Sequence, residues 1–380
     1  MKIGILSLVL HNNYGGILQA YALQTVLERM GHEVVIFNKE IPLRQVGYKI
    51  LLKRLIMKML GRDVVVFSER KTFQEEPIVN KSLIDFRKRY IHEEFINQLK
   101  DIADYKLDCI VVGSDQVWRA KYFKEQWKEP MENAFLSFTR GWTIKRISYA
   151  ASFGTDCWEY TDNETDRIRE SVKSFDAISV RESSGIPLLK KCLNVDSELV
   201  LDPTLLLSKN DYINLIKTSK AQQSPGNLLV YLLDPTTRQK EIIKSIEERK
   251  GLTAFSVNRR GVSLTAPIEQ RILPSIESRL RGFYDAELIV TDSFHACVFS
   301  IIFGKPFIVF GNKQRGMSRF ESLLSKFCLS SCLVDESIDI NNIIDLINQI
   351  EYSNVAKQFE QERLASQKFL EKAFVENSNN

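Results

Sequence analysis

Residues 2–37, KIGILSLVLHNNYGGILQAYALQTVLERMGHEVVIF, hold the pattern that decides the fold. An apolar run at 2–10 ends in a turn with two glycines, and apolar positions at helical spacing follow over 17–30. A second apolar run at 34–37 has the length and β-branched content of a buried strand. Strand, helix and strand in this order predict the beginning of a parallel sheet, because parallel strands need a crossover connection.

Two series of such units follow along the chain. Further buried strands are predicted at 109–112, 147–151 and 177–180, which gives a first Rossmann-like domain over 1–205. The second series consists of strands at 228–233, 288–290 and 306–310 with helices at 237–250 and 294–303, which gives a second Rossmann-like domain over 206–354. Residues 355–380 are predicted to form a charged amphipathic helix and a tail. The predicted class is α/β, with two Rossmann-like domains facing each other across a cleft.

Charge and cysteine content exclude several classes of protein. Lys and Arg number 52 against 48 Asp and Glu, so the net charge of +4 over 380 residues is too small to predict a nucleic-acid partner. The six cysteines include no Cys-x-x-Cys pair and mostly lie in apolar runs, as reduced thiols do, which predicts a cytoplasmic protein. Metal-ligand spacings are missing from the sequence, so we expect no metal.

One segment, 43–62, fits neither domain well. Its sequence LRQVGYKILLKRLIMKMLGR mixes basic and large apolar residues as an amphipathic helix does. Such a helix can lie in a membrane interface, where each basic residue near anionic lipid contributes about 1 kcal/mol. The alternative is an insertion helix that packs on its own domain.

Ligands of open α/β sheets bind beyond the carboxyl ends of the strands, so the residues after each predicted strand are the first candidates. In the N-terminal half, the turn 11–16 would let backbone approach a ligand, and VVGSDQVW at 111–118 offers hydroxyl, carboxylate and indole groups that suit a sugar. A tight structural turn and ordinary core packing are the alternatives. The predicted acceptor-binding residues are His11, Asn12, Asn13, Tyr14, Gly15, Ser114, Asp115 and Trp118.

Two more strands end in charged residues. Arg181 follows the strand at 177–180 and could bind a carboxylate or phosphate through its guanidinium fork, unless it forms a surface pair with Glu182. The turn at 202–204 fits an interdomain connection at least as well as a site.

The sharpest signal is LIVTDSFHACVFSIIFGKPFIVF at 288–310, which places His295 between a buried strand and an apolar helix. A helix N-terminus there favours phosphate, and an imidazole can transfer a proton near neutral pH. The alternative is a capped, structural histidine. Several cations follow within a short stretch, enough to hold a doubly anionic ligand: Lys305, Lys313, Arg315 and Arg319.

These motifs, in this order, resemble the polysaccharide pyruvyl transferase family over most of the chain. The segments that carry the resemblance are HNNYGGILQAYAL, VVGSDQVW, ISYAASFG, SVRE, LDPTLLL, TDSFHACVFSIIFGKPFIVF and RGMSRF. The resemblance implies a GT-B-like fold and transfer of a pyruvyl group from phosphoenolpyruvate onto a sugar as a ketal. It also implies a donor held mainly by the C-terminal domain, an acceptor held by the N-terminal domain, and no cofactor.

Residue by residue, the resemblance implies catalytic roles for Arg181 on the donor and for His295 as acid or base. Many members of the family carry an arginine two positions before that histidine, where this chain has Ser293. We therefore predict that Arg315 or Arg319 supplies the donor cation, with Ser293 and Lys305 also binding the donor. The acceptor is expected to be a lipid-linked glycan of surface or capsular polysaccharide synthesis at the inner face of the cytoplasmic membrane.

Two other functions stay open on sequence alone. The first is a GT-B glycosyltransferase that uses a nucleotide sugar, since Glu269 and Glu277 have the Glu-x7-Glu spacing of retaining enzymes of that architecture. The second is a glycan-binding protein without catalytic activity. Incubation with phosphoenolpyruvate or with nucleotide sugars distinguishes these functions, by release of phosphate, by release of nucleotide, or by glycan binding without turnover.

Overall fold

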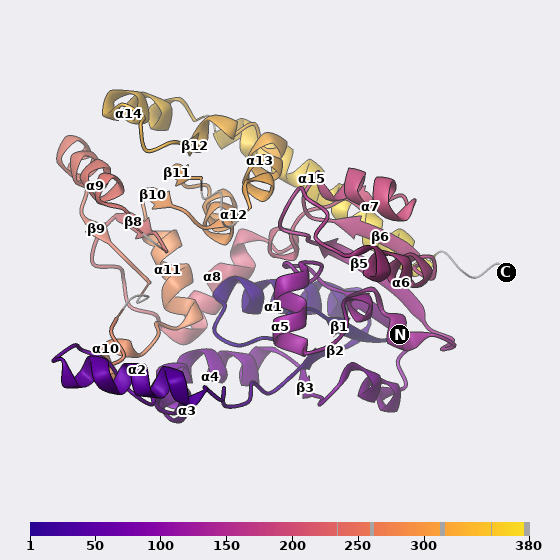
Figure 1. The fold of residues 1–380 in the computed structure, drawn as a ribbon. Coiled ribbons are helices and arrows are strands. Elements are labelled where there is room, and N and C mark those ends of the chain that lie inside the picture. The colour runs from indigo at the N-terminus through magenta and orange to yellow at the C-terminus, as the bar shows by residue number, and fades with distance from the viewer. Residues whose placement is uncertain (234, 259–261, 312–315, 351, 376–380) are drawn as a thin grey trace.

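The computed structural model describes residues 1–233, 235–258, 262–311, 316–350 and 352–375, which form two α/β units (Figure 1). The first unit contains a parallel seven-stranded sheet in the order β3-β2-β1-β4-β5-β6-β7. Its strands are β1 (Lys2–Leu6), β2 (Glu33–Asn38), β3 (Glu93–Phe95), β4 (Cys109–Val112), β5 (Lys145–Ala151), β6 (Ala177–Val180) and β7 (Glu198–Leu199). β4 and β6 have the predicted bounds; β4 is buried at every residue, and β6 is buried over its second half.

The second unit contains a parallel five-stranded sheet in the order β12-β11-β10-β8-β9. Its strands are β8 (Leu228–Tyr231), β9 (Ala254–Phe255), β10 (Leu288–Thr291), β11 (Phe307–Phe310) and β12 (Leu333–Val334). The fold is therefore the predicted α/β class with two Rossmann-like domains.

Helices cover both sheets. In the first unit they are α1 (Tyr14–Arg29), α2 (Tyr48–Met59), α3 (Ser68–Val79), α4 (Lys81–Tyr90), α5 (Ala120–Trp127), α6 (Asp162–Val172) and α7 (Gly185–Leu193), with short 3-10 turns η1 (Leu99–Tyr105), η2 (Met131–Phe135) and η3 (Ser137–Thr139). The connection to the second unit contains η4 (Pro203–Leu206) and α8 (Lys209–Ser219). The second unit has α9 (Thr237–Lys250), α10 (Ile268–Arg271), α11 (Ile276–Asp285), α12 (Phe294–Phe303), α13 (Met317–Lys326), η6 (Ser330–Cys332) and α14 (Ile340–Gln349).

The last helix, α15 (Tyr352–Val375), bridges the two units (Figure 1). Near its start the Tyr352 hydroxyl donates to the carbonyl of Lys305 in the second unit. Near its end the Lys145 ammonium of the first unit donates to two carbonyls of α15, at distances of 3.0 and 3.2 Å. A continuous cluster of buried apolar side chains also joins α1, η4, α8, α11 and α12. The two units are thus held together along one side.

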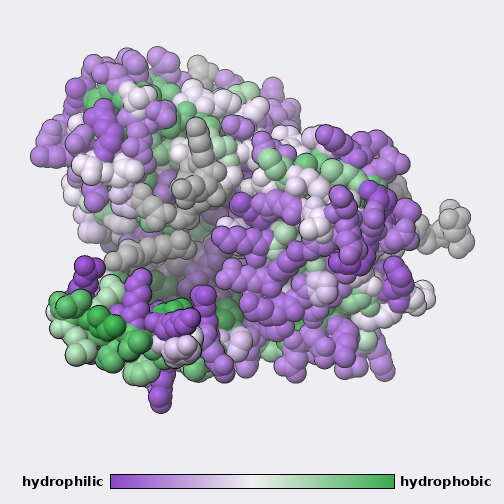
Figure 2. Space-filling model, in the orientation of Figure 1, coloured by the Kyte–Doolittle hydropathy of each residue, from purple (hydrophilic) through white to green (hydrophobic). Residues whose placement is uncertain are grey.

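Helix α2 accounts for the basic amphipathic segment, and it contains no buried residue. Large apolar side chains stand in solvent along it, with Tyr48 75%, Met59 79% and Leu60 72% exposed. Figure 2 shows the resulting hydrophobic patch at the lower left of the molecule. Neither α2 nor any other helix of the described ranges is long and apolar enough to cross a bilayer.

Candidate functional site

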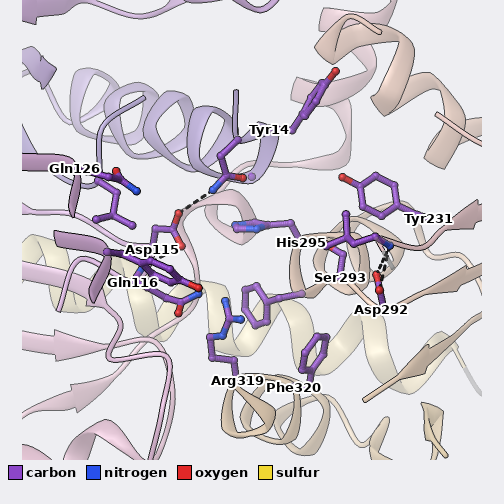
Figure 3. Close-up of a pocket in the computed structure, with 16 residues that line it drawn as sticks. Tyr14, Asp115, Gln116, Gln126, Tyr231, Asp292, Ser293, His295, Arg319 and Phe320 are labelled. Carbon is purple, nitrogen blue, oxygen red and sulfur yellow. Dashed lines mark hydrogen bonds between the residues drawn. The ribbon is translucent and has the colours of Figure 1, made fainter. Parts of the chain in front are cut away.

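A cavity of about 290 Å³ lies between the two units, beyond the carboxyl ends of β1, β4, β8 and β10 (Figure 3). This is the position at which open parallel sheets bind ligands. The first unit lines it with Leu8, Asn13, Tyr14, Gly15, Asp115, Gln116, Tyr122 and Gln126. The second unit lines it with Tyr231, Leu233, Asp292, Ser293, Phe294, His295, Arg319 and Phe320.

Two helix N-termini converge on this cavity, one from each unit. Asn13, Tyr14 and Gly15 at the start of α1 and Ser293 to His295 at the start of α12 all line it. Neither Asn13 nor Ser293 caps its helix through its side chain, so backbone N–H groups at the start of α12 carry no side-chain cap where they meet the cavity. Both helix dipoles therefore favour a negative charge in the cavity.

His295 lies between the two units. A Cβ atom added to Gly15 would fall 2.5 Å from its Cε1, so only glycine lets α1 approach this closely. The Nε2 atom of the ring lies 3.7 Å from a carboxylate oxygen of Asp202 and has no hydrogen-bond partner among the described residues. Burial lowers the pKa of His295 below its ordinary value, and the charges of Asp202 and Asp115 oppose that shift while Arg181 and Arg319 reinforce it. The imidazole is therefore neutral at pH 7 in the unliganded site.

Behind His295, Asp202 is held by Arg181. The Arg181 guanidinium donates to Asp202 over 2.9 Å, and both side chains are at most 1% exposed. Asp115 and Glu182 lie 3.7 and 3.9 Å from the same guanidinium. Burial alone would raise the pKa of Asp202, but His295 and Arg181 lower it overall, so the carboxylate stays ionised. Arg181 thus acts on the site through Asp202, and its side chain is not among those that line the cavity.

Arg319 is the cation that faces the cavity from the second unit (Figure 3). It comes from the first turn of α13, and its guanidinium carbon lies 5.5 Å from the centre of the Phe294 ring. Burial lowers its pKa to about 10, with the charge of Arg181 adding to the shift. An arginine with that pKa is still charged at neutral pH. This is one of the two arginines that the sequence offered in place of the arginine missing at Ser293; the other, Arg315, lies outside the described residues, as does Lys313.

Two carboxylates line the cavity from opposite units. Asp115 has a backbone φ of 66°, rare for a residue other than glycine. Its carboxylate accepts hydrogen bonds from the Asn13 side chain at 3.3 Å and from the backbone N–H of Gln116 at 2.9 Å. The Asn13 side chain thus donates to Asp115 and does not cap α1. The Asp292 carboxylate accepts a hydrogen bond from the backbone N–H of Leu233. This bond joins the loops that follow β8 and β10.

Two residues predicted for the site lie away from the cavity. Trp118 is fully buried against Phe135, and its indole N–H donates to the carbonyl of Ala134, so its ring is not available to a sugar. Lys305 follows the far end of the ten-residue α12, which puts it about 15 Å from the His295 end. Its ammonium faces Tyr284 and does not line the cavity.

Three other predicted residues border the site without lining it. Ser114 is buried, and its hydroxyl donates to Asp202 at 3.3 Å. His11 and Asn12 line a second cavity of about 230 Å³ between α3 and residues 262–273, where His11 pairs with Glu76. The residues selected from the sequence for the site did not include Gln116, Tyr231 or Asp202. Asp202 directly follows an apolar stretch and lies in LDPTLLL, a segment of the family resemblance, but its turn fitted an interdomain connection at least as well as a site.

The alternative sequence signals find no place at the cavity. Glu277 is buried within α11, Glu269 lies on the exposed surface of α10, and neither lines it. Within the described part of the chain, no group of three or more His, Cys, Asp or Glu residues is placed to hold a metal ion.

Solved structures with the same overall fold cover nearly the whole chain at low sequence identity. Neisseria meningitidis UDP-GlcNAc 2-epimerase bound to UDP-GlcNAc has a TM-score of 0.51 and 11% identity, with 99% of this chain and 100% of that chain covered. Arabidopsis thaliana UGT89C1 complexed with UDP-L-rhamnose has a TM-score of 0.52 and 11% identity, with 98% and 97% covered. At these identities the likeness establishes the GT-B fold and not the reaction.

A comparison with curated protein sequences gave no match. The sequence profile described as polysaccharide pyruvyl transferase, however, matches residues 13–314. That range contains the N-termini of α1 and α12 and all cavity-lining residues from Asn13 to His295. Because the match covers well over half of the chain, this protein belongs to the polysaccharide pyruvyl transferase family, a family of transferases.

Proposed function

We propose that the protein transfers the pyruvyl group of phosphoenolpyruvate onto two hydroxyls of a glycan sugar, forming a ketal and releasing phosphate. One observation carries the proposal: two uncapped helix N-termini and Arg319 converge on a cavity that also holds His295. A small dianion satisfies all of these groups at once, because backbone N–H groups and guanidinium both bind phosphate oxygens. The cavity volume of about 290 Å³ suits a small donor together with one acceptor ring.

The donor is assigned to the C-terminal side of the cavity. Ser293 and the first N–H groups of α12 would bind the phosphate, with Arg319 neutralising its charge. The acceptor is assigned to the N-terminal side, where Asn13, Asp115 and Gln116 offer donors and acceptors to sugar hydroxyls.

The chemistry requires proton transfers that this arrangement supports. The two acceptor hydroxyls form C–O bonds to C2 of the donor, its methylene carbon takes up one hydroxyl proton, and phosphate leaves with the other. His295, neutral in the free site and beside Asp202, would be protonated once the donor is bound, deliver that proton to the methylene carbon and then take one from an acceptor hydroxyl. General acid or base catalysis of this kind typically accelerates a reaction about 10² to 10⁴-fold. Stabilisation of the transition-state charge by the helix ends and Arg319 must therefore supply the larger share of the rate enhancement.

We further propose a lipid-linked acceptor at the cytoplasmic face of a membrane, as in capsular or surface polysaccharide synthesis. The support is the exposed face of α2, whose apolar side chains stand beside Lys49, Lys53 and Lys58. These three lysines form no ion pair within the described residues, whereas Arg54 pairs with Glu69. Apolar side chains flanked by free cations match an anionic bilayer surface.

The test is to supply different donors to the purified protein with a lipid-linked glycan extract. Release of phosphate from phosphoenolpyruvate, dependent on the extract, supports the proposal. Release of nucleotide from UDP- or GDP-sugars instead would identify a glycosyltransferase, and glycan binding without turnover would identify a binding protein.

A further inference from the structure

Arg279 is a buried cation outside the groups considered so far. It comes from α11, and its side chain is held between two tyrosine rings, with the guanidinium carbon 3.3 Å from the centre of Tyr14 and 4.8 Å from that of Tyr231. The residue is 3% exposed. Its Nη1 donates to the Tyr231 hydroxyl, whereas its Nε has no hydrogen-bond partner within the described residues. In the same part of the chain, it forms no ion pair with a carboxylate.

A buried guanidinium without a counter-ion is costly. The faces of two phenol rings attract it, but they offset only part of the desolvation that a buried cation incurs. Two other buried arginines have carboxylate partners: Arg181 pairs with Asp202, and Arg271 pairs with Glu75. A third, Arg146, donates instead to the hydroxyl of Thr139 and to three backbone carbonyls. Among the residues that the structure describes, the guanidinium of Arg279 has only the Tyr231 hydroxyl as an acceptor, and an anion supplied by a ligand would complete its surroundings.

The Tyr231 hydroxyl connects Arg279 to the main cavity. Tyr231 lines that cavity at the end of β8, and Figure 3 shows its ring above Ser293 with the hydroxyl on the side where His295 lies. A space of about 20 Å³, lined by Arg279, shares Tyr14, Gly15, Tyr231 and His295 with the main cavity. Because the hydroxyl oxygen accepts from Arg279, its own proton is left to be donated to a ligand.

We propose that the Tyr231 hydroxyl, oriented and polarised by Arg279, binds the carboxylate of the donor. This inference rests on the proposed function and names the part of the site that separates phosphoenolpyruvate from phosphate alone. The start of α12 and Arg319 take the phosphate, and Tyr231 takes the second anionic group on the other side of His295. Tyr231 is a binding residue, and Arg279 is a positioning residue that acts through it. The pair places a positive charge beside Tyr231, which lines the cavity together with Ser293, the position at which many members of the family carry an arginine.

The experiment compares phosphoenolpyruvate with inorganic phosphate as ligands of Tyr231→Phe and Arg279→Met, by titration calorimetry and by steady-state kinetics. Loss of a hydrogen bond to a charged group predicts a KM and a Kd for phosphoenolpyruvate raised roughly 10- to 100-fold. The inhibition constant of phosphate is expected to stay within about twofold, because phosphate lacks the carboxylate; this also shows that the variants are folded. Arg279→Lys should recover part of the loss.

Two substitutions on the same helix serve as matched controls. Arg281→Met removes a cation that pairs with Asp285 at 2.7 Å, and Tyr284→Phe removes an exposed phenol, so both should behave as wild type. Unchanged affinity of Tyr231→Phe for phosphoenolpyruvate, or an equal loss of affinity for both ligands, would overturn the carboxylate assignment and leave the proposed function standing. Absence of phosphoenolpyruvate binding by the wild-type protein would overturn both.

Discussion

Gly15 of the first unit lies directly against the imidazole of His295 in the second. A Cβ at position 15 would sit 2.5 Å from Cε1 and from Cγ of the ring and still nearer to Nδ1. Real Cβ atoms do not approach other heavy atoms this closely, so the contact depends on the missing side chain. The rotamer of His295 therefore depends on how closely α1 approaches α12, and the absence of a side chain at Gly15 allows that approach.

Gly15→Ala should displace His295 and reduce kcat by more than 100-fold, since an acid or base group contributes about 10² to 10⁴-fold. The free energy of unfolding should fall by no more than about 1 to 3 kcal/mol, because the cost of the clash is partly offset by alanine's helix preference over glycine of about 1 kcal/mol. Gly16→Ala, one residue along the same turn, is the matched control: its Cβ would lie 3.3 Å from the Asn13 side chain and 3.5 Å from Asp115 Oδ2, close to ordinary contact distances. Steady-state kinetics and thermal unfolding of both variants check this. Equal activity of the two would contradict the role of the contact.

Asp202→Asn should destabilise the protein by about 3 to 5 kcal/mol, because it leaves the Arg181 guanidinium buried without its closest counter-ion. Urea unfolding measures the loss. The double variant Arg181→Met, Asp202→Asn should regain part of the stability, since neither member of the pair stays charged and the asparagine can still accept from Thr204, whereas Asp115 and Glu182 lose their neighbouring guanidinium. It should stay inactive, because His295 has lost its carboxylate. A double variant as unstable as the single one would count against this explanation.

Binding of phosphoenolpyruvate should take up a proton at His295. The free imidazole has a lowered pKa and is neutral at pH 7, and a dianion beside it stabilises the charged form, so the pKa rises on binding. Affinity should therefore increase as the pH falls from about 8 to 6. Calorimetry in buffers of different ionisation enthalpy measures the proton directly.

His295→Gln is the control for that measurement. The donor phosphate has its own ionisation near pH 6, which remains in the variant, so the difference between the two proteins isolates the histidine. Identical proton uptake in both would show that His295 does not sense the donor.

Arg319→Met should raise the KM for the donor roughly 10- to 100-fold, because the cation faces the cavity. Lys305→Met removes a cation that the sequence also suggested but that lies at the far end of α12. It should leave donor affinity unchanged. The two variants show which of the two cations binds the donor. A larger rise of the KM for the donor in Lys305→Met than in Arg319→Met would refute the assignment of Arg319 to the donor phosphate.

Changing Met59 and Leu60 to glutamate should weaken binding to vesicles of anionic lipid by at least tenfold, because both side chains stand exposed at the end of α2. Leu364→Glu places the same charge at an exposed apolar position on α15 and is the matched control. Sedimentation with vesicles measures binding, and activity on a soluble acceptor should not change. Vesicle binding that is absent from the wild type, or equal in all variants, would rule out α2 as a membrane contact.

Local sequence patterns predicted the fold well, because buried parallel strands and their crossover helices leave long apolar runs. The bounds of α9 and α12 match the prediction. The rule that ligands bind beyond strand ends also located Asn13, Asp115, Ser293 and His295 at one cavity.

The remaining site residues could not be predicted, since their roles depend on which way a side chain points. Trp118 and Asp115 belong to one motif, yet the indole turns into the core and the carboxylate into the cavity. Arg279 and Tyr231 are far apart in sequence, and only the packing of α11 on α1 brings them to the site.

The most direct test of the central claim uses uniformly ¹³C-labelled phosphoenolpyruvate with a lipid-linked glycan extract, followed by mass spectrometry of the glycans. Pyruvyl transfer predicts a glycan that gains all of the labelled carbons, loses two hydroxyl hydrogens and appears together with unlabelled phosphate. His295→Gln should abolish that product. Unlabelled glycans with the wild-type protein, accompanied by consumption of a nucleotide sugar, would contradict the account.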